Sequence, residues 1–299
     1  MKLALSMTRR NTILFFKDKG LFLTSLITPL ILLLLYATFL GGIYYDSFVD
    51  NVPGISEELA NAAVGGQLIS SILAVSCVTV SFCSNMLMVQ DKANGSIKDL
   101  TIAPIKHSSL ALGYYAATLI STLIICLVAT AVCLIYVAFV GWYLSFTDVL
   151  VLLGSVVLTV TFGTALSSVI NFFLSNQGQI SAVGSIVSSC YGFLCGAYMP
   201  ISQFGDGLQK LLSFLPGTYA TSILRNACLG GVIVEMENQG IPQEAIEALK
   251  TATDCNVFFG EEAVSLPVMY AILSGTTVLL IGIYVLLNVL KSKKIIKIK

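Results

Sequence analysis

The residues best suited to a specific interaction lie in a short polar loop between the second and third long apolar stretches of the chain. Gly95 can end the preceding helix, and Ser96 can cap a new one. Ile97 and Leu100 would share one face of that new helix, which Pro104 would stop. A simple connection needs only a few turn residues, so a capped and amphipathic insert favours a docking surface for a partner protein. An ordinary loop is the alternative.

The sequence lacks the common motifs of catalytic sites. It contains no G-x-x-x-x-G-K-[ST] phosphate loop, whose backbone amides and lysine hold ATP in P-loop enzymes. Its one histidine, His107, stands beside an apolar stretch and is interpreted as an interfacial residue, and no Cys and His cluster has the spacing of metal ligands. We therefore expect no catalytic residue, no metal site and no ATP hydrolysis by this chain itself.

The composition indicates an integral membrane protein. Of the 299 residues, 56% are hydrophobic and 11% are charged, and the mean hydropathy is +0.90. Soluble domains average about 25% charged residues, so a soluble enzyme, a nucleic-acid binder, a coiled coil and a disordered chain are excluded. Continuous rather than alternating hydrophobicity also excludes a transmembrane barrel.

Six stretches are long enough to cross a bilayer as helices, since about 20 helical residues span a hydrocarbon core of roughly 30 Å. The apolar run from Val149 to Gly205 is divided into two crossings by the polar break at 175–179. The predicted spans are residues 21–45, 65–89, 108–140, 148–174, 179–199 and 264–290. The predicted fold is an all-α polytopic membrane protein, with residues 21–299 as its six-span domain.

The basic residues predict the orientation, because segments rich in Lys and Arg tend to stay cytoplasmic. Thirteen of the 16 basic residues lie in the N-terminal segment, the 91–106 loop and the C-terminal tail, whereas 13 of the 16 acidic residues lie in the other loops. Both termini are expected to be cytoplasmic, in a bacterial plasma membrane. Residues 1–20 mix basic and apolar side chains, which predicts an interfacial amphipathic helix that either anchors the chain or relays movement from a partner.

Two predicted spans carry residues that favour close helix contacts or a transport path. The span 179–199 has small residues at every fourth position, which form a stripe along which another helix can pack. These residues are Gly184, Ser188, Gly192 and Gly196. The span 65–89 is rich in hydroxyl groups, which can bond to helices or to cargo. The residues expected to line a substrate path are Thr79, Phe82, Met86, Ser188, Tyr191 and Cys195, with helix packing alone as the alternative.

Residues 200–265 form the one substantial region expected outside the membrane. A Leu-Pro-Gly bend at 215–217 would begin a re-entrant segment, followed by an apolar helix at 218–229 that is too short to cross. Residues 232–262 are acidic and contain a good helix former at 242–250, so they predict a small external cap. A solvated loop is the alternative.

Two cysteines, Cys228 and Cys255, lie in this external region, whereas the other six lie in predicted spans. Cysteine within a span usually acts as a small apolar residue. Oxidising surroundings would permit a disulfide between the two external cysteines, and free thiols are the alternative.

The chain resembles a membrane subunit of the type 2 family of ABC exporters, which is similar in fold to the G-type transporters. The family's acidic-x-x-x-Gly-Ser/Thr-x-x-x-Leu-x-x-x-Pro loop stands here as Asp91, Gly95, Ser96, Leu100 and Pro104, with Asp91 in place of the more usual Glu. The amphipathic N-terminal segment precedes a first span that contains Pro29. The run 215–219, followed by Arg225 and Gly230, resembles the family's re-entrant segment before the last span.

The resemblance implies a permease subunit, paired with a second membrane subunit that is identical or homologous and seated on a separate ATPase subunit. ATP and Mg would be bound by that ATPase subunit, and this chain would bind no cofactor and no nucleic acid. The 91–106 loop would be the coupling helix, with Lys92, Ile97, Leu100 and Ile102 as its contact surface. The full coupling set is Asp91, Lys92, Gly95, Ser96, Ile97, Leu100, Ile102 and Pro104.

The expected function is the ATP-driven export of a hydrophobic or amphiphilic compound, such as a drug, lipid, peptide or glycan. An uncharged and partly aromatic path suits such a compound better than an ion. A membrane receptor or assembly scaffold with an external sensing cap is the first alternative. A secondary transporter is disfavoured because the apolar stretches contain no Asp, Glu, Lys, Arg or His.

Overall fold

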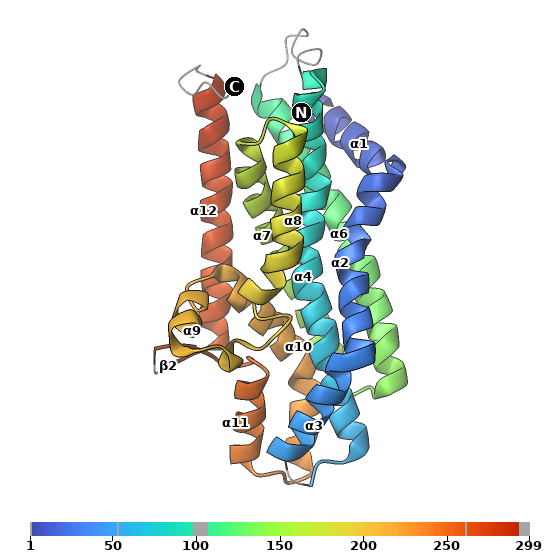
Figure 1. Cartoon of the computed structure of the whole chain (residues 1–299), viewed down its shortest axis with the longest axis vertical. Helices are drawn as coiled ribbons and strands as arrows, with labels where there is room; N and C mark the ends of the chain where they lie inside the picture. Colours follow the sequence, from blue (N-terminus) through green and yellow to red (C-terminus); the bar gives the residue numbers. More distant parts are fainter. Residues whose placement is uncertain (1, 53, 98–106, 261, 293–299) are drawn as a thin grey trace.

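The computed structural model describes residues 2–52, 54–97, 107–260 and 262–292, which form a bundle of long helices with a small helical and β-hairpin region on one side (Figure 1). The elements in chain order are α1 (Lys2–Lys17), α2 (Lys19–Leu35), the π-helix η1 (Tyr36–Leu40), α3 (Gly41–Asn51), α4 (Glu57–Ala93), α6 (His107–Val140), α7 (Phe146–Phe172), α8 (Gln177–Leu194), the 3-10 helix η2 (Ile201–Gln203), α9 (Asp206–Leu212), α10 (Pro216–Asn238), α11 (Gln243–Ala252), β1 (Val257–Phe259), β2 (Glu262–Val264) and α12 (Leu266–Ser292).

The two ends of the bundle differ in which elements they carry. The start of α1 and the ends of α4 and α12 lie together, at the top in Figure 1, and we call this the terminal end. The elements α3 and α11 lie at the opposite end, which we call the distal end. The segment 91–97, which begins the predicted docking loop, is therefore at the same end as the N-terminal helix.

Five helical segments among the described residues are long and apolar enough to cross a membrane. They are Lys19–Asp50, Glu57–Ala93, Ser108–Val140, Phe146–Phe172 and Leu266–Ser292, and each corresponds to a predicted span. The first runs on through η1 and α3, and the second begins eight residues earlier than predicted. The predicted span 179–199 corresponds to α8, which has 18 residues and begins with Gln177 and Gln179, so its hydropathy is lower.

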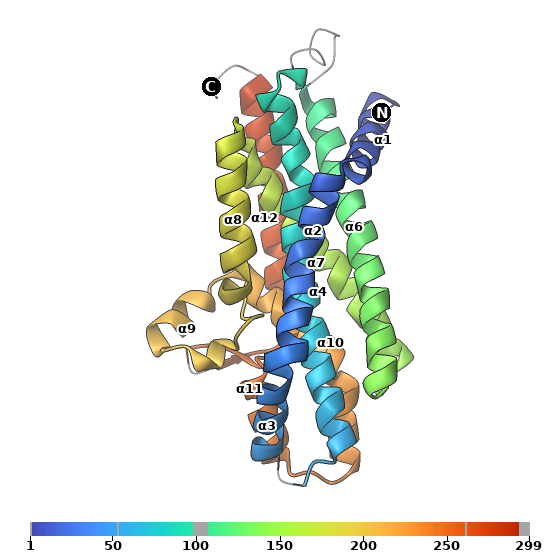
Figure 2. The same ribbon diagram turned by 45° about the vertical axis from the view of Figure 1, so that its right-hand side comes forward.

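The helix α4 forms the centre of the bundle, because α2, α6, α7, α8 and α10 all pack against it (Figure 2). Its 37 residues correspond to a length of about 55 Å at 1.5 Å per residue. Small residues allow the closest contacts: a Cβ atom built on Gly163 of α7 would lie 2.8 Å from the carbonyl oxygen of Cys77 in α4. Glycine at this crossing lets the two backbones meet.

The N-terminal helix α1 is a separate helix set at an angle to α2 (Figure 2). The side chain of Asp18 separates them, since its Oδ1 atom accepts the backbone N–H groups of Gly20 and Leu21 at 3.0 and 3.1 Å and so caps α2. The predicted amphipathic helix at 1–20 thus corresponds to α1. It packs along α6, where a Cβ atom on Gly113 would lie 2.7 Å from the Cβ atom of Met7.

The region 200–265 differs from the prediction in two respects. The strands β1 and β2 form an antiparallel hairpin in which Phe258 is paired with Ala263, so the fold is not entirely helical. The predicted helix 218–229 is longer, because α10 has 23 residues and continues to Asn238, with Pro216 in its first turn. The predicted helix at 242–250 is confirmed as α11.

Candidate functional site

The polar loop after α4 begins as the sequence predicts. Gly95 has a φ of +80°, a left-handed conformation that glycine adopts without strain and that ends the helix. Ser96 and Ile97 are helical again, which agrees with a second helix starting there. The predicted contact residues Leu100 and Ile102, together with Pro104, lie outside the described residues.

Asp91, the acidic residue at the start of the loop motif, joins three helices. Its Oδ2 atom accepts a hydrogen bond from Nη1 of Arg10 in α1 at 3.0 Å and another from the hydroxyl of Tyr114 in α6 at 2.6 Å. Burial lowers the pKa of Arg10, but the hydrogen bond and charge of Asp91 outweigh it and leave that pKa raised. Asp91 therefore ties the N-terminal helix to α4 and α6. Sequence reasoning had not singled out Tyr114.

Lys92 lies in a different place from the exposed contact surface expected for it. Its Nζ atom donates to the carbonyl oxygens of Asn171, Phe172 and Leu174, at 3.0, 2.9 and 3.0 Å, where α7 ends. The last carbonyls of a helix lack the i+4 amides that pair the others, and a cation there is also stabilised by the negative end of the helix dipole. The ammonium groups of Lys92 and Lys291 both lie over the Phe172 ring, at 5.7 and 5.4 Å from its centroid. Lys92 thus fastens α4 to the end of α7.

Ile97 adds an apolar contact beside Asp91 and Lys92. It packs, half-buried, against the buried cluster of Met7, Met88, Leu110 and Tyr114 from α1, α4 and α6. The close approach of α1 to α6 at Gly113 adds to the same contact. We call Arg10, Asp91, Lys92, Ile97 and Tyr114 the terminal cluster. It connects α1, the start of the loop, α6 and the end of α7 through five hydrogen bonds and the apolar packing of Ile97.

The predicted path residues are mostly buried inside the bundle. Thr79 and Phe82 of α4 are each 2% exposed, and the Thr79 hydroxyl donates to the carbonyl of Val75 in its own helix. Ser188 and Tyr191 of α8 are half-buried, and Cys195 is buried just beyond the end of that helix. The structure therefore brings these residues to the region where α4 and α8 pack.

The small-residue stripe of α8 is covered partly by the chain itself. A Cβ atom on Gly184 would lie 2.6 Å from the end of the Met86 side chain in α4, and one on Gly192 would overlap the ring of Tyr198. Gly196 is not part of the stripe, because α8 ends at Leu194 and Gly196 is in a left-handed turn with a φ of +74°. The predicted stripe therefore stops at Gly192.

Polar side chains of α4 bond to neighbouring helices. The amide of Asn85 donates to the hydroxyls of Ser167 and Ser168 in α7 at 3.2 and 3.0 Å. The hydroxyls of Ser81 and Thr164 lie 3.4 Å apart on the same pair of helices. Such interhelical bonds hold helices together in a bilayer, so these groups serve packing.

A second polar cluster, which we call the distal clamp, holds the region after α8. Arg225 of α10 is fully buried. Its Nη1 atom pairs with Oδ2 of Asp254 at 3.0 Å, and its Nη2 atom donates to the carbonyl oxygen of Gly196 at 2.6 Å. The Asp254 carboxylate also accepts the backbone N–H groups of Ile201 and Ser202 at 2.6 and 3.2 Å. Burial raises the pKa of Asp254, and Arg225 and these amides counteract only part of that effect. Sequence reasoning had not identified Asp254 as a partner.

The two cysteines predicted to be external are free thiols in the structure, so the expected disulfide is absent. Cys228 and Cys255 are buried, at 3% and 1% exposure. The Cys255 sulfur accepts a hydrogen bond from the hydroxyl of Thr253 at 3.3 Å, and burial raises the pKa of its thiol to about 11. A buried thiol with a raised pKa is poorly reactive.

Comparison with known proteins identifies one family. The family model described as ABC-2 type transporter matches residues 2–229, which include α1, the loop after α4, the span helices through α7, α8 and most of α10. A comparison with curated proteins found no significant match.

Proposed function

Because the chain belongs to the ABC-2 type transporter family, a family of multi-pass membrane proteins, we propose that it is the permease subunit of an ATP-driven exporter. A separate ATPase subunit would bind ATP and Mg and supply the energy. The observation that carries the proposal is the terminal cluster, which joins the N-terminal helix and the start of the 91–106 loop to the span helices.

The terminal cluster gives a physical route for coupling. In the proposed cycle, ATP-driven closure of the ATPase subunits presses on the 91–106 loop and on α1, with Leu100 and Ile102 supplying apolar contacts, while Ile97 transmits the force to the cluster on which it packs. Asp91 links the loop to α1 and α6, and Lys92 links it to the end of α7. A push on the loop would therefore move these helices together.

The topology proposed for this function has six spans, with both termini in the cytoplasm of a bacterial cell. The helix α8 would be the fifth span, since it packs against α4, the central helix of the bundle (Figure 1). The segment α9–α10 would be re-entrant from outside. The distal clamp supports this, because it satisfies the Gly196 carbonyl and the Ile201 and Ser202 amides that a bend inside the membrane would otherwise leave unpaired.

A second membrane subunit is proposed to pack on the exposed face of α8. Ser181, Ser185 and Ser189 recur every four residues on this face and are exposed in the isolated chain. Hydroxyl groups and small side chains favour helix contacts over lipid contacts, so this face is suited to a protein partner. Movement of the two subunits would then open a path beside Thr79, Phe82, Met86, Ser188, Tyr191 and Cys195 for an amphiphilic cargo.

Reconstitution of the chain with its ATPase subunit tests the proposal. Leu100→Asp would place a charge on the apolar face of the coupling loop, and we expect substrate-stimulated ATP hydrolysis and transport to be lost while membrane insertion is retained. Val234→Asp is the matched control, because Val234 is 55% exposed near the distal end of α10. Unchanged coupling in Leu100→Asp would show that the loop is not the coupling element, and transport without any ATPase subunit would refute the proposed function.

A further inference from the structure

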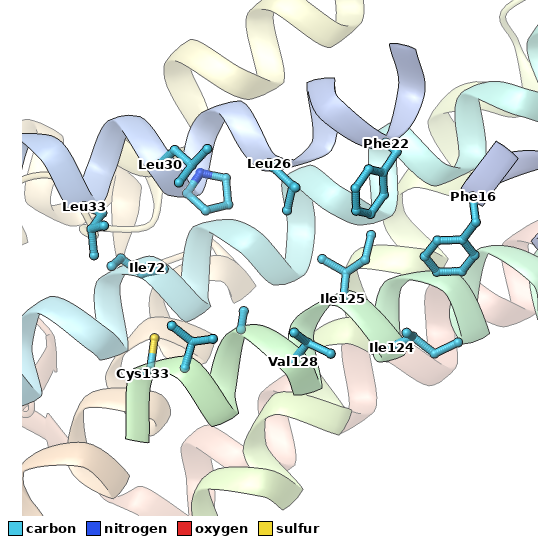
Figure 3. Close-up of a pocket in the computed structure, with 13 residues that line it drawn as sticks. Phe16, Phe22, Leu26, Leu30, Leu33, Ile72, Ile124, Ile125, Val128 and Cys133 are labelled. Carbon is cyan, nitrogen blue, oxygen red and sulfur yellow. The ribbon is translucent and has the colours of Figure 1, made fainter. Parts of the chain in front are cut away.

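An apolar groove of about 470 Å³ runs along the outside of the bundle between α2 and α6 (Figure 3). Both helices pack on α4, and Ile72 of α4 lies at the bottom of the gap between them. All thirteen lining side chains are apolar, from Phe16 and Phe22 at one end to Leu33 and Cys133 at the other. The groove is thus a defined apolar cavity on the outer surface of the chain.

The groove is open on the surface of the chain along its length. Leu30 on the α2 side is 60% exposed, and Val128 and Val132 on the α6 side are 61% and 60% exposed. From Phe22 to Leu33 the groove follows eleven residues of α2, a distance of roughly 16 Å, which is about half of a 30 Å hydrocarbon core. It therefore has the depth of a single leaflet.

Two lysines stand at the terminal end of this groove. Lys19 precedes Phe22 by three residues and Leu26 by seven, so it continues the groove-lining face of α2 by one more turn. Lys17, next to the lining residue Phe16, is the last residue of α1. Both lysines are exposed, and neither belongs to an ion pair within the described residues.

The acidic residue between these lysines, Asp18, offsets only one of their two charges and leaves the corner with a net positive charge. The Asp18 carboxylate is turned to the start of α2, where it accepts the N–H groups of Gly20 and Leu21. A carboxylate in that position is stabilised by the positive end of the helix dipole. The corner at Lys17 and Lys19 thus presents two cations where α1 meets the first span.

We propose that this groove binds an anionic phospholipid, with one acyl chain between α2 and α6 and the headgroup phosphate at Lys17 and Lys19. The volume fits: if a methylene occupies about the 30 Å³ of a water molecule, the groove holds roughly 16 of them, the length of one acyl chain. An apolar chain gains no hydrophobic free energy by leaving other lipid chains, so selection between lipids must come from the headgroup. Basic corners beside transmembrane helices attract anionic headgroups. The proposal depends on the membrane location and not on the transport activity.

Native mass spectrometry of protein taken from phosphatidylcholine vesicles with a minor fraction of phosphatidylglycerol tests this binding. We expect phosphatidylglycerol to be retained in preference to phosphatidylcholine. Each of the substitutions Lys17→Gln and Lys19→Gln should lower that preference roughly fivefold. Lys210→Gln, an exposed lysine of α9 in the distal half, is the charge control and should leave it unchanged.

A groove-filling variant tests the position of the acyl chain. Val128→Trp should fill the groove and abolish retention of phosphatidylglycerol, whereas Leu23→Trp, at the same 61% exposure on α2 but outside the groove, should not. Both sites are exposed, so neither variant disturbs the core. Equal retention of the two lipids, or unchanged retention in Val128→Trp, would overturn the proposal. So would a disulfide between two copies through Val128→Cys, since a second subunit would then occupy the groove.

Discussion

The terminal and distal ends of the bundle are each held by an arginine–aspartate pair with a nitrogen–oxygen distance of 3.0 Å, but the two pairs have different surroundings. The side chains of Arg10 and Asp91 are 35% and 10% exposed, whereas those of Arg225 and Asp254 are 1% and 7% exposed. A pair that water reaches can separate at little cost, because water solvates both charges. A buried pair cannot, since either partner alone would be an uncompensated charge. The comparison indicates a terminal end that can rearrange and a distal end that is fixed.

The largest expected effect is the loss of the distal clamp. Arg225→Ala leaves Asp254 buried without its cation and should lower the free energy of unfolding by about 3–5 kcal/mol. The double variant Arg225→Met with Asp254→Asn should lose less, because no charge would remain to be desolvated and an asparagine oxygen can still accept the Ile201 amide. Unfolding by SDS titration in detergent measures the stability of the single and the double variant. A double variant as unstable as Arg225→Ala would contradict the argument.

Glycine-to-alanine substitutions at the two ends of the bundle should also differ in how much stability they cost, but by a smaller amount. A Cβ atom on Gly231 of α10 would overlap the backbone carbonyl of Tyr143. Backbone gives way less readily than a flexible side chain, so Gly231→Ala should destabilise by about 3 kcal/mol. Gly113→Ala at the terminal end should cost about 1 kcal/mol, because α1 can shift away from α6 as a separate helix.

The control for these glycine substitutions is Gly154→Ala. Nothing lies within 4 Å of a Cβ atom there, so alanine should gain up to about 1 kcal/mol of helix propensity. The same SDS titrations rank the three variants. A Gly113→Ala variant less stable than Gly231→Ala would mean that α1 is held as rigidly as the distal end.

The smallest effect on stability is expected at the terminal pair. Arg10→Ala should cost about 1 kcal/mol, because Arg10 is partly exposed and Asp91 keeps the hydrogen bond from Tyr114. Hydrogen exchange of the α1 amides should nevertheless rise, since one of the ties of α1 to α4 is lost. Lys250→Ala, which breaks the exposed pair with Glu247 in α11, should leave α1 exchange unchanged. Unaltered exchange in Arg10→Ala would show that apolar packing alone holds α1.

Much of the fold follows from local sequence signals. Long apolar runs predict the span helices, Gly95 predicts the end of α4, and the acidic, helix-favouring run at 242–250 predicts α11. Each of these depends on residues close together in the chain. The β-hairpin was missed because each of its strands has only three residues, too few for a periodic pattern.

The side-chain partners could not be predicted in the same way. Lys92 is an ordinary basic loop residue in sequence, and only the packing of α4 on α7 brings it to the carbonyls of residues 171–174, which lie some 80 positions away. Tyr114 and Asp254 gave no signal either, because a tyrosine near a span end and an aspartate in an acidic region are common. A four-residue repeat does not show where a helix stops, so the predicted stripe extends to Gly196, two residues beyond the end of α8.

The continuity of α4 connects the two ends. Its residues near Asp91 belong to the terminal cluster, and a Cβ atom on Gly66, near its other end, would lie 3.1 Å from the carbonyl of Cys228 in the helix that carries Arg225. A straight rod about 55 Å long converts a tilt of about 5° at one end into a displacement of roughly 5 Å at the other. If the distal end of α4 is held in place, the helix pivots about that end. The largest displacement then occurs at the terminal end, near Asp91.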